Sequence, residues 1–279
     1  MLLKRQLSKS NESEVLPETP AHLDVEKISV GYNGKAVLED LSFQIPQGKR
    51  VAVVGPNGAG KSTLFKAMVG LLPLGSGAIH IHGLPLGGHQ HCVAYVPQRE
   101  EVDWRFPLSV SDVVMMGRYG HQGWLGRPNK LDQEIVFHCL DQMGISGLAK
   151  HSIRELSGGQ QQRIFLARAL AQEPHILLMD EPFSGVDTPT QEATLSLLEE
   201  LNSQQVTVLV STHDLNMAAQ KFEATLLLNH RLIAFGTASQ VFTPENIRQA
   251  FGSQILMLDD AVFIDECCPP DENRMEHLE

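Results

Sequence analysis

The sequence lacks an excess of positive charge, a paired set of cysteines and a long hydrophobic run, and each absence excludes a class of protein. The net charge is −11 at pH 7, and the pI is about 5.5. A protein that binds nucleic acid without sequence preference presents a basic surface, so this charge argues against that function. We therefore expect no nucleic-acid partner.

The cysteines show no spacing that suggests a disulfide framework. In a chain of 279 residues, the four of them fit a reducing cytoplasm: Cys92, Cys139, Cys267 and Cys268. No stretch approaches the roughly 18 apolar residues of a membrane span, and the first residues have no apolar core long enough for a signal peptide. We expect a soluble chain whose membrane role would come through a partner.

The stretch from Arg50 to Met68, RVAVVGPNGAGKSTLFKAM, carries the strongest motif in the chain. Val51–Val54 is an apolar run typical of a buried parallel strand. It leads into the pattern G-x-x-x-x-G-K-[ST], whose backbone N–H groups and helix N-terminus hold phosphate anions. The fixed positions alone recur in about one chain in a hundred of this length, so the other motifs must decide. The predicted phosphate-binding residues are Gly55, Pro56, Asn57, Gly58, Ala59, Gly60, Lys61, Ser62 and Thr63.

Two of these residues have particular roles in that motif. Lys61 is expected to reach the β- and γ-phosphates, and Ser62 offers a hydroxyl to Mg²⁺. A glycine-rich turn that carries Lys-Ser by chance is the alternative.

Two adjacent carboxylates follow a second buried strand, Ile176–Met179. Asp180 is suited to hold Mg²⁺, and Glu181 is suited to take a proton from an attacking water, which contributes roughly 10²–10⁴-fold to a rate. By itself Asp-Glu-Pro could simply cap the next turn. Together with the phosphate loop, a Mg²⁺–nucleotide site is the better explanation.

The segment Leu156–Gln160, LSGGQ, opens a predicted helix over Gln160–Ala171. A serine and two glycines at a helix start make another N-terminus suited to an anion. Taken alone, this segment would be an ordinary N-cap.

The order of elements predicts an α/β fold. Short strands at Leu23–Val25, Ile28–Val30, Val37–Leu38 and Leu41–Ile45 predict an N-terminal antiparallel β-subdomain. After residue 156, strands alternate with helices, which indicates a P-loop core with a mostly parallel sheet. We predict a disordered tail over 1–21, one folded domain over 22–252 with a helical subdomain inserted at about 98–156, and a C-terminal extension over 253–279.

With these motifs in this order, the chain resembles the nucleotide-binding subunit of an ABC transporter, from about Leu23 to Gly252. The resemblance implies that the chain binds ATP and Mg²⁺ and hydrolyses ATP to energise transport through separate transmembrane permease subunits. It also implies a peripheral place on the cytoplasmic face of the bacterial inner membrane. Soluble ABC ATPases of DNA repair or translation are the alternative class, but they need coiled coils, zinc modules or a second cassette.

The resemblance also implies roles for individual residues. Two copies of the chain would face head to tail, with each ATP between Lys61 of one copy and Ser157 of the other. The implied roles are adenine stacking by Tyr32, sensing of Mg²⁺ and water by Gln98, contact with the partner's γ-phosphate by Ser157, Gly158, Gly159 and Gln160, communication across the dimer by Asp187, and a switch at the γ-phosphate by His213. An aromatic beside a turn is usually local packing, and a histidine at a strand end can be purely structural.

The segment from Val102 to Tyr119 resembles the branch of this family that serves importers of manganese, zinc or iron. Such importers are fed by an extracytoplasmic metal-binding protein. We expect manganese first, and an importer of chelated iron, haem or cobalamin is the alternative. Because these residues would touch the permease and not the cargo, this inference is analogy.

Histidines gather between residues 80 and 91. Alternate positions place His80 with His82 on one strand face, and His89 with His91 on another. Such a cluster could sense a metal, but a solvated hairpin rich in histidine is the interpretation we favour.

Overall fold

A computed structural model describes residues 22–87, 92–99, 104, 106–121, 127–252, 255–258 and 261–264. The predicted tail over 1–21, the pair His89 and His91, and most of the segment from residue 99 to 107 lie outside these residues. None of the helices in this described part of the chain combines the length and the hydrophobicity of a membrane-spanning helix.

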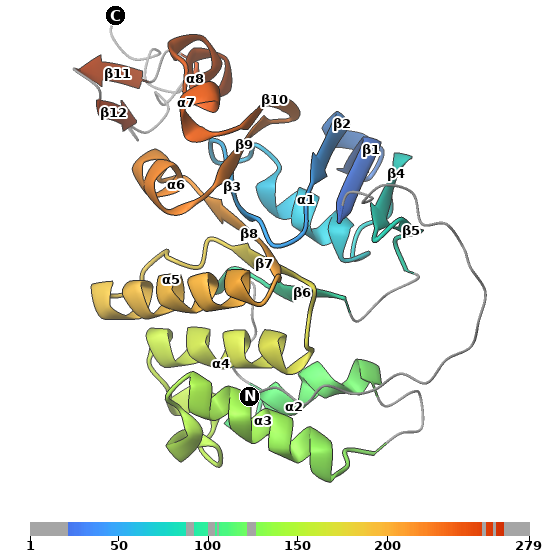
Figure 1. Ribbon diagram of the computed structural model, residues 1–279, viewed down its shortest axis with the longest axis vertical. Coiled ribbons are helices and arrows are strands. Elements are labelled where there is room, and N and C mark those ends of the chain that lie inside the picture. The colour runs from blue at the N-terminus through green and yellow to red at the C-terminus, as the bar shows by residue number, and fades with distance from the viewer. Residues whose placement is uncertain are drawn as a thin grey trace, which may run out of the picture.

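A six-stranded sheet forms the centre of the molecule, with the order β10-β9-β3-β8-β7-β6 (Figure 1). All neighbouring pairs are parallel except β9 and β10, so the predicted mostly parallel sheet is confirmed. The strands are β3 (Arg50–Val54), β6 (Val93–Val96), β7 (Ile176–Asp180), β8 (Thr207–Thr212), β9 (Ala224–Asn229) and β10 (Arg231–Gly236).

Strand β3 shows why these strands are continuous apolar runs. Val51 and Val53 point into one core, which contains helix α1 (Lys61–Met68) and the antiparallel sheet. Ala52 and Val54 point into the other core, which contains the helical region. Because both faces of the sheet are covered, all four residues from Val51 to Val54 are buried.

The antiparallel sheet has the order β2-β1-β4-β5. On each side of the turn at Asn33, the two short strands that were predicted form one continuous strand. Lys27 and Asp40, with φ of +45° and +51°, lie at irregularities of the strand pairing, and these irregularities break the alternation of apolar residues in the sequence. The strands are β1 (Leu23–Tyr32), β2 (Lys35–Ile45), β4 (Ser76–Ile81) and β5 (Leu84–Pro85).

Helices α2, α3 and α4 lie together at the end of the molecule away from the antiparallel sheet (Figure 1). Each begins with a capping box, in which the side chain of Ser109, Asn129 or Ser157 accepts from a backbone N–H three residues on. The bounds of this region are α2 (Val110–Met115), η2 (Met116–His121), α3 (Lys130–Gln142), η3 (Ser146–Leu148), η4 (Ile153–Glu155) and α4 (Gly158–Ala171).

The remaining elements follow the order of the chain. They are α5 (Thr188–Ser203), α6 (Leu215–Lys221), α7 (Ala238–Val241), α8 (Pro244–Phe251), β11 (Ile255–Leu258) and β12 (Ala261–Ile264). The division of the chain into a tail, an ATPase domain and a C-terminal extension stays a prediction.

One buried ion pair joins α3 to η2 and to the C-terminal end of α4. The guanidinium of Arg118 donates to Asp132 at 3.0 Å, and to the carbonyl of Ala171 and the carboxylate of Glu173 at 2.7 Å each. Arg118 and Asp132 are both almost fully buried. The position of the helical region on the core therefore depends on a charge that cannot be solvated.

We expect Asp132→Asn to lower the free energy of unfolding by about 3 kcal/mol, measured by urea denaturation. Breaking a buried ion pair costs about 3–5 kcal/mol. We expect the lower end of this range because Glu173 still contacts Arg118 in the variant. The matched control is Glu134→Gln on the exposed face of the same helix, where we expect a change within about 0.5 kcal/mol. Equal effects of the two substitutions would contradict this account of the junction.

Candidate functional site

The loop between β3 and α1 has a shape that only glycine permits at two positions. A Cβ on Gly55 would lie 2.1 Å from the carbonyl oxygen of Leu228, and a Cβ on Gly60 would lie 2.4 Å from a methyl carbon of Leu38. Gly60 also has φ of +101° and is the N-cap of α1. The loop therefore packs its backbone closely against neighbouring strands.

Lys61 is the first residue of α1, and its side chain is only 5% exposed. Its ammonium donates to the carbonyl oxygens of Gly55 at 2.8 Å and Pro56 at 3.3 Å. Burial lowers the pKa of Lys61, while Glu181 and Asp180 act in the opposite direction. The loop thus folds back on its own cation.

Asp180 is the last residue of β7 and is 1% exposed. Its carboxylate accepts from the Ser211 hydroxyl at 2.5 Å and from the Tyr95 hydroxyl at 3.3 Å. Both donors stand on the neighbouring strands, β8 and β6. The carboxylate is therefore held at the C-terminal edge of the sheet by the strands on either side.

Glu181 leaves the strand with φ of +45°, a left-handed conformation that is uncommon outside glycine. Its backbone N–H donates to the Ser211 hydroxyl at 2.8 Å. Its carboxylate lies 3.6 Å from the Lys61 ammonium and 3.7 Å from Nδ1 of His213. The turn therefore directs Glu181 toward both groups.

A cleft lined by residues 57–63, Val37, Gln98 and Glu181 lies above this edge of the sheet. A second cleft shares Glu181 and contains His213, Ser211 and Thr212. The structure thus brings together the phosphate loop, Gln98, Glu181 and His213, with Asp180 directly before Glu181 in the chain. These are the residues that the first two motifs and the resemblance assign to one site.

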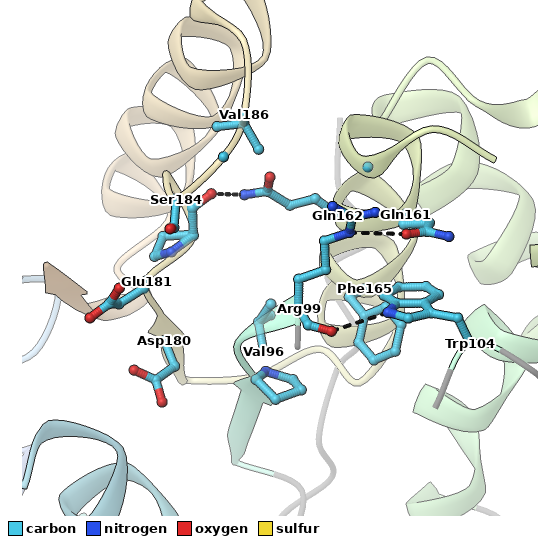
Figure 2. A pocket seen from close by; sticks show the side chains of 14 residues that line it. Val96, Arg99, Trp104, Gln161, Gln162, Phe165, Asp180, Glu181, Ser184 and Val186 are labelled. Carbon is cyan, nitrogen blue, oxygen red and sulfur yellow. Dashed lines mark hydrogen bonds between the residues drawn. The ribbon is translucent and has the colours of Figure 1, made fainter. Parts of the chain in front are cut away.

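The LSGGQ segment lies outside the phosphate-loop cleft. Ser157 caps α4 and forms a reciprocal pair with Gln160, whose side chain accepts from the Ser157 N–H at 2.9 Å. Gly158 lines a separate pocket with Asp180, Glu181 and Arg99 (Figure 2). None of Ser157, Gly158, Gly159 and Gln160 is among the residues that line the phosphate-loop cleft.

Asp187 and Tyr32 also lie outside the lining of that cleft. Asp187 caps α5 by accepting from the Thr190 N–H at 2.8 Å, and hydrogen bonds from Thr190 hold the pKa of Asp187 below its ordinary value. Tyr32 ends β1 and is 44% exposed. One chain alone therefore gathers only part of the predicted site.

Two residues that contact this region were not predicted from the sequence. Ser211 is the next-to-last residue of β8, which lies beside β7, and a polar residue near the end of that buried strand was the signal for it. Arg99 donates to Gln161 at 3.1 Å, and its guanidinium is close enough to Gly158 that a Cβ there would lie 3.0 Å away. Nothing in the sequence indicates that contact.

Residues 38–184 match the family model described as ABC transporter. The chain is 48% identical to the manganese transport system ATP-binding protein of Bacillus subtilis over 241 residues, which cover 86% of this chain and 96% of the relative. It is 47% identical to the zinc transport system ATP-binding protein of Treponema pallidum, over 84% of this chain and 88% of the relative.

The fold is also similar to a solved chain of an ABC transporter of the metal-chelate type in an inward-facing conformation. The TM-score is 0.73 and the sequence identity is 33%, with 87% of this chain and 95% of the solved chain covered.

We expect Ser211→Ala to lower the free energy of unfolding by about 1–3 kcal/mol, because the buried carboxylate of Asp180 and the N–H of Glu181 both lose a partner. The control is Ser203→Ala, whose exposed hydroxyl bonds only within its own helix. Thermal and urea unfolding of the two variants measure the difference. If Ser211→Ala were as stable as Ser203→Ala, the hydroxyl of Ser211 would not hold the end of the strand.

Proposed function

Because the chain belongs to the ABC transporter family and is an ATP-binding subunit that couples ATP hydrolysis to transport, we propose that its nucleotide site is the phosphate-loop cleft. The observation that carries this proposal is the position of Glu181 on the wall of that cleft, within 4 Å of both Lys61 and His213. A cation, a carboxylate and an imidazole thus converge where a γ-phosphate would lie.

The loop offers the triphosphate two kinds of partner. Its backbone N–H groups and the N-terminus of α1 hold the phosphates, and the Lys61 ammonium neutralises their negative charge. In exchange, Lys61 gives up its bonds to the carbonyls of Gly55 and Pro56. Tyr32, exposed at the end of β1, would stack on the adenine ring.

The oxygen donors beside the loop fit Mg²⁺, which prefers hydroxyl, amide and carboxylate oxygens. Ser62 and Gln98 line the cleft, and Asp180 directly precedes Glu181 of the cleft wall and is held by Ser211 and Tyr95. We assign the ion to these three residues. Mg²⁺ bound there would neutralise charge on the phosphates.

Glu181 is the general base in this proposal. Its strained backbone and its bond to Ser211 direct the carboxylate into the cleft, where it can accept a proton from the attacking water. His213, 3.7 Å away, would contact the γ-phosphate and report its presence. Gln98 would orient the water and the ion.

We expect Glu181→Gln to bind ATP as tightly as the parent while the rate of hydrolysis falls about 10²-fold or more, because the amide cannot accept the proton. ATP binding is measured by calorimetry and turnover by phosphate release. The variant should also accumulate an ATP-bound dimer on size-exclusion chromatography. Glu200→Gln, on the exposed face of α5, is the control. Near-parental turnover in Glu181→Gln would remove this residue from the role.

The LSGGQ segment completes the site of a second copy. The N-terminus of α4 is suited to an anion, yet within one chain it lies outside the cleft lining. A head-to-tail dimer would place Ser157, Gly158, Gly159 and Gln160 against the γ-phosphate on the other copy, and Asp187 beside the same interface. ATP then favours the closed dimer, and hydrolysis releases it.

The permease subunits receive this motion through the helical region. Helices α2 and α3 stand at the far end of the molecule from the antiparallel sheet (Figure 1) and pack against α4, so we expect the three helices to move together. We place the chain on the cytoplasmic face of the membrane, bound to the permease and served indirectly by an extracytoplasmic metal-binding protein. No nucleic-acid partner is proposed.

The cargo we propose is a transition-metal ion, with manganese first and zinc and iron next. The supporting observations are the names of the two relatives above, a manganese system and a zinc system at 48% and 47% identity. The second candidate is a metal chelate, and the 33% identity to the solved metal-chelate type transporter favours it specifically.

Cells without this subunit should contain less of one transition metal and grow poorly when that metal is scarce. Elemental analysis of the cells measures manganese, zinc and iron together. The Lys61→Ala gene should fail to restore the metal because phosphate binding is lost, whereas Lys221→Ala, an exposed lysine at the end of α6, should restore it. If the cells contained normal amounts of all three metals but could not use a siderophore, haem or cobalamin, the cargo would be a chelate and not a free metal ion.

A further inference from the structure

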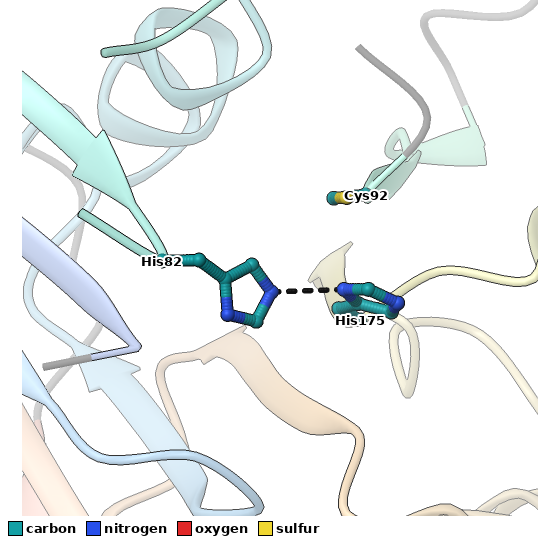
Figure 3. A group of neighbouring side chains, drawn as sticks. All are labelled: His82, Cys92 and His175. Carbon is teal, nitrogen blue, oxygen red and sulfur yellow. Dashed lines mark hydrogen bonds between the residues drawn. The ribbon is translucent and has the colours of Figure 1, made fainter. Parts of the chain in front are cut away.

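A cluster of nitrogen and sulfur ligands lies at the amino ends of β6 and β7, the edge of the parallel sheet opposite the nucleotide cleft. Figure 3 shows its three side chains. His82 follows β4, while Cys92 and His175 directly precede β6 and β7. One ligand atom from each of the three residues lies within 4.8 Å of the other two. The side chains come from three segments, so the fold and not the local sequence brings them together.

The backbone fixes all three residues. The carbonyl of Cys92 accepts from the N–H groups of His175 and Ile176 at 2.8 Å each, which joins the amino ends of the two parallel strands. The N–H of His82 donates to the carbonyl of His22 at 3.0 Å, and φ of His82 is +52°. His82 and His80 consequently belong to different clusters, because His80 lies with Asp24 and Glu26.

His22 forms the buried wall of the cluster. It is 2% exposed, and its ring packs edge-on against that of His82 with a centroid distance of 4.2 Å. Its Nε2 lies 3.3 Å from the carbonyl oxygen of His175, while its Nδ1 is buried without a hydrogen-bond partner among the described residues. The junction therefore has one buried ring nitrogen, Nδ1 of His22, that no described residue pairs.

We propose that His82, Cys92 and His175 bind one transition-metal ion of the zinc class, which joins the antiparallel sheet to the parallel sheet. Nε2 of His82 and Nδ1 of His175 are 2.8 Å apart in one hydrogen bond. A tetrahedral zinc ion, with Zn–N of about 2.0–2.1 Å, needs them about 3.3 Å apart. A small rotation of the partly exposed rings achieves this, and each ring keeps a proton on its other nitrogen. The thiol of Cys92 loses its proton to solvent as the sulfur–metal bond forms.

The ligand set selects the metal. Two imidazoles and a thiolate suit Zn²⁺, whereas Mn²⁺ prefers oxygen ligands and stands at the weak end of the divalent series. This site is thus separate from any manganese cargo, and it does not depend on the proposed ATPase mechanism. The cluster of Asp24, Glu26 and His80 offers mainly oxygen and provides an internal comparison.

The test uses untagged full-length protein in which Cys267 and Cys268 are replaced by serine, after removal of metals with a chelator. Cobalt is the probe, because Zn²⁺ has no visible spectrum and Co²⁺ bound to a thiolate has a sulfur-to-metal charge-transfer band. We expect this band to saturate at one cobalt ion per chain, to disappear on addition of Zn²⁺, and to be absent in Cys92→Ser. His82→Asn and His175→Asn should weaken cobalt binding at least tenfold. Substitution of a residue that only supports a metal ligand already lowers the affinity by about this factor, and these two residues are ligands.

His80→Asn is the matched control: His80 stands on β4, two residues before His82, and its replacement should leave the band unchanged. Circular dichroism, and ATP hydrolysis without any transition metal, confirm that each variant is folded. His82→Gln and Cys92→Ala replace any variant that is not. No sulfur band in the parent, or a band that survives in Cys92→Ser or falls equally in His80→Asn, would overturn the proposal.

Discussion

The geometry of the proposed nucleotide site depends on the interactions of one buried cation, the ammonium group of Lys61. An ammonium group in a protein interior is costly unless it is paired and hydrogen-bonded. Lys61 satisfies this requirement with two carbonyls of its own loop and with Glu181, which lies 120 residues further along the chain. This pairing links the phosphate loop to the end of β7, so the nucleotide-binding loop and the proposed general base are positioned by the same interaction.

Holding Glu181 in reach of Lys61 requires support from the neighbouring strand. Ser211 on β8 donates to Asp180 and accepts from the N–H of Glu181, which keeps the left-handed turn in place. Strain of this kind is found where surrounding structure over-determines a conformation, often at functional sites. In the proposed mechanism, the phosphates replace the loop carbonyls as partners of Lys61, and the carboxylates do not need to move.

The parts of this site that are local in sequence could be predicted, and the parts made by contacts between strands could not. The buried strand before Gly55 and the strand before Asp180 are apolar because both faces of the sheet are covered, which their composition shows directly. The bond from Ser211 to Asp180 depends on the pairing of β7 with β8, and no spacing in the sequence expresses it. The same holds for the cluster of His82, Cys92 and His175. From the sequence, a solvated hairpin is the favoured interpretation of the histidines near residue 80, and nothing local to that segment indicates His175, which directly precedes the distant strand β7. Helix α7 was not predicted because its four residues make about one turn, which is too short to show a period. Helix α8 was also missed, although its buried residues Ile247, Ala250 and Phe251 stand at helical spacing.

The central claim is that one chain carries only part of a working nucleotide site, since its phosphate loop and its LSGGQ segment do not line a common cleft. The most direct test is the rate of ATP hydrolysis per chain, at saturating ATP and Mg²⁺, over a thousandfold dilution of the protein, with the oligomeric state followed by sedimentation. The account predicts that the rate per chain falls on dilution in step with the fraction of dimer. A rate per chain that stays constant down to concentrations at which only monomers sediment would contradict it.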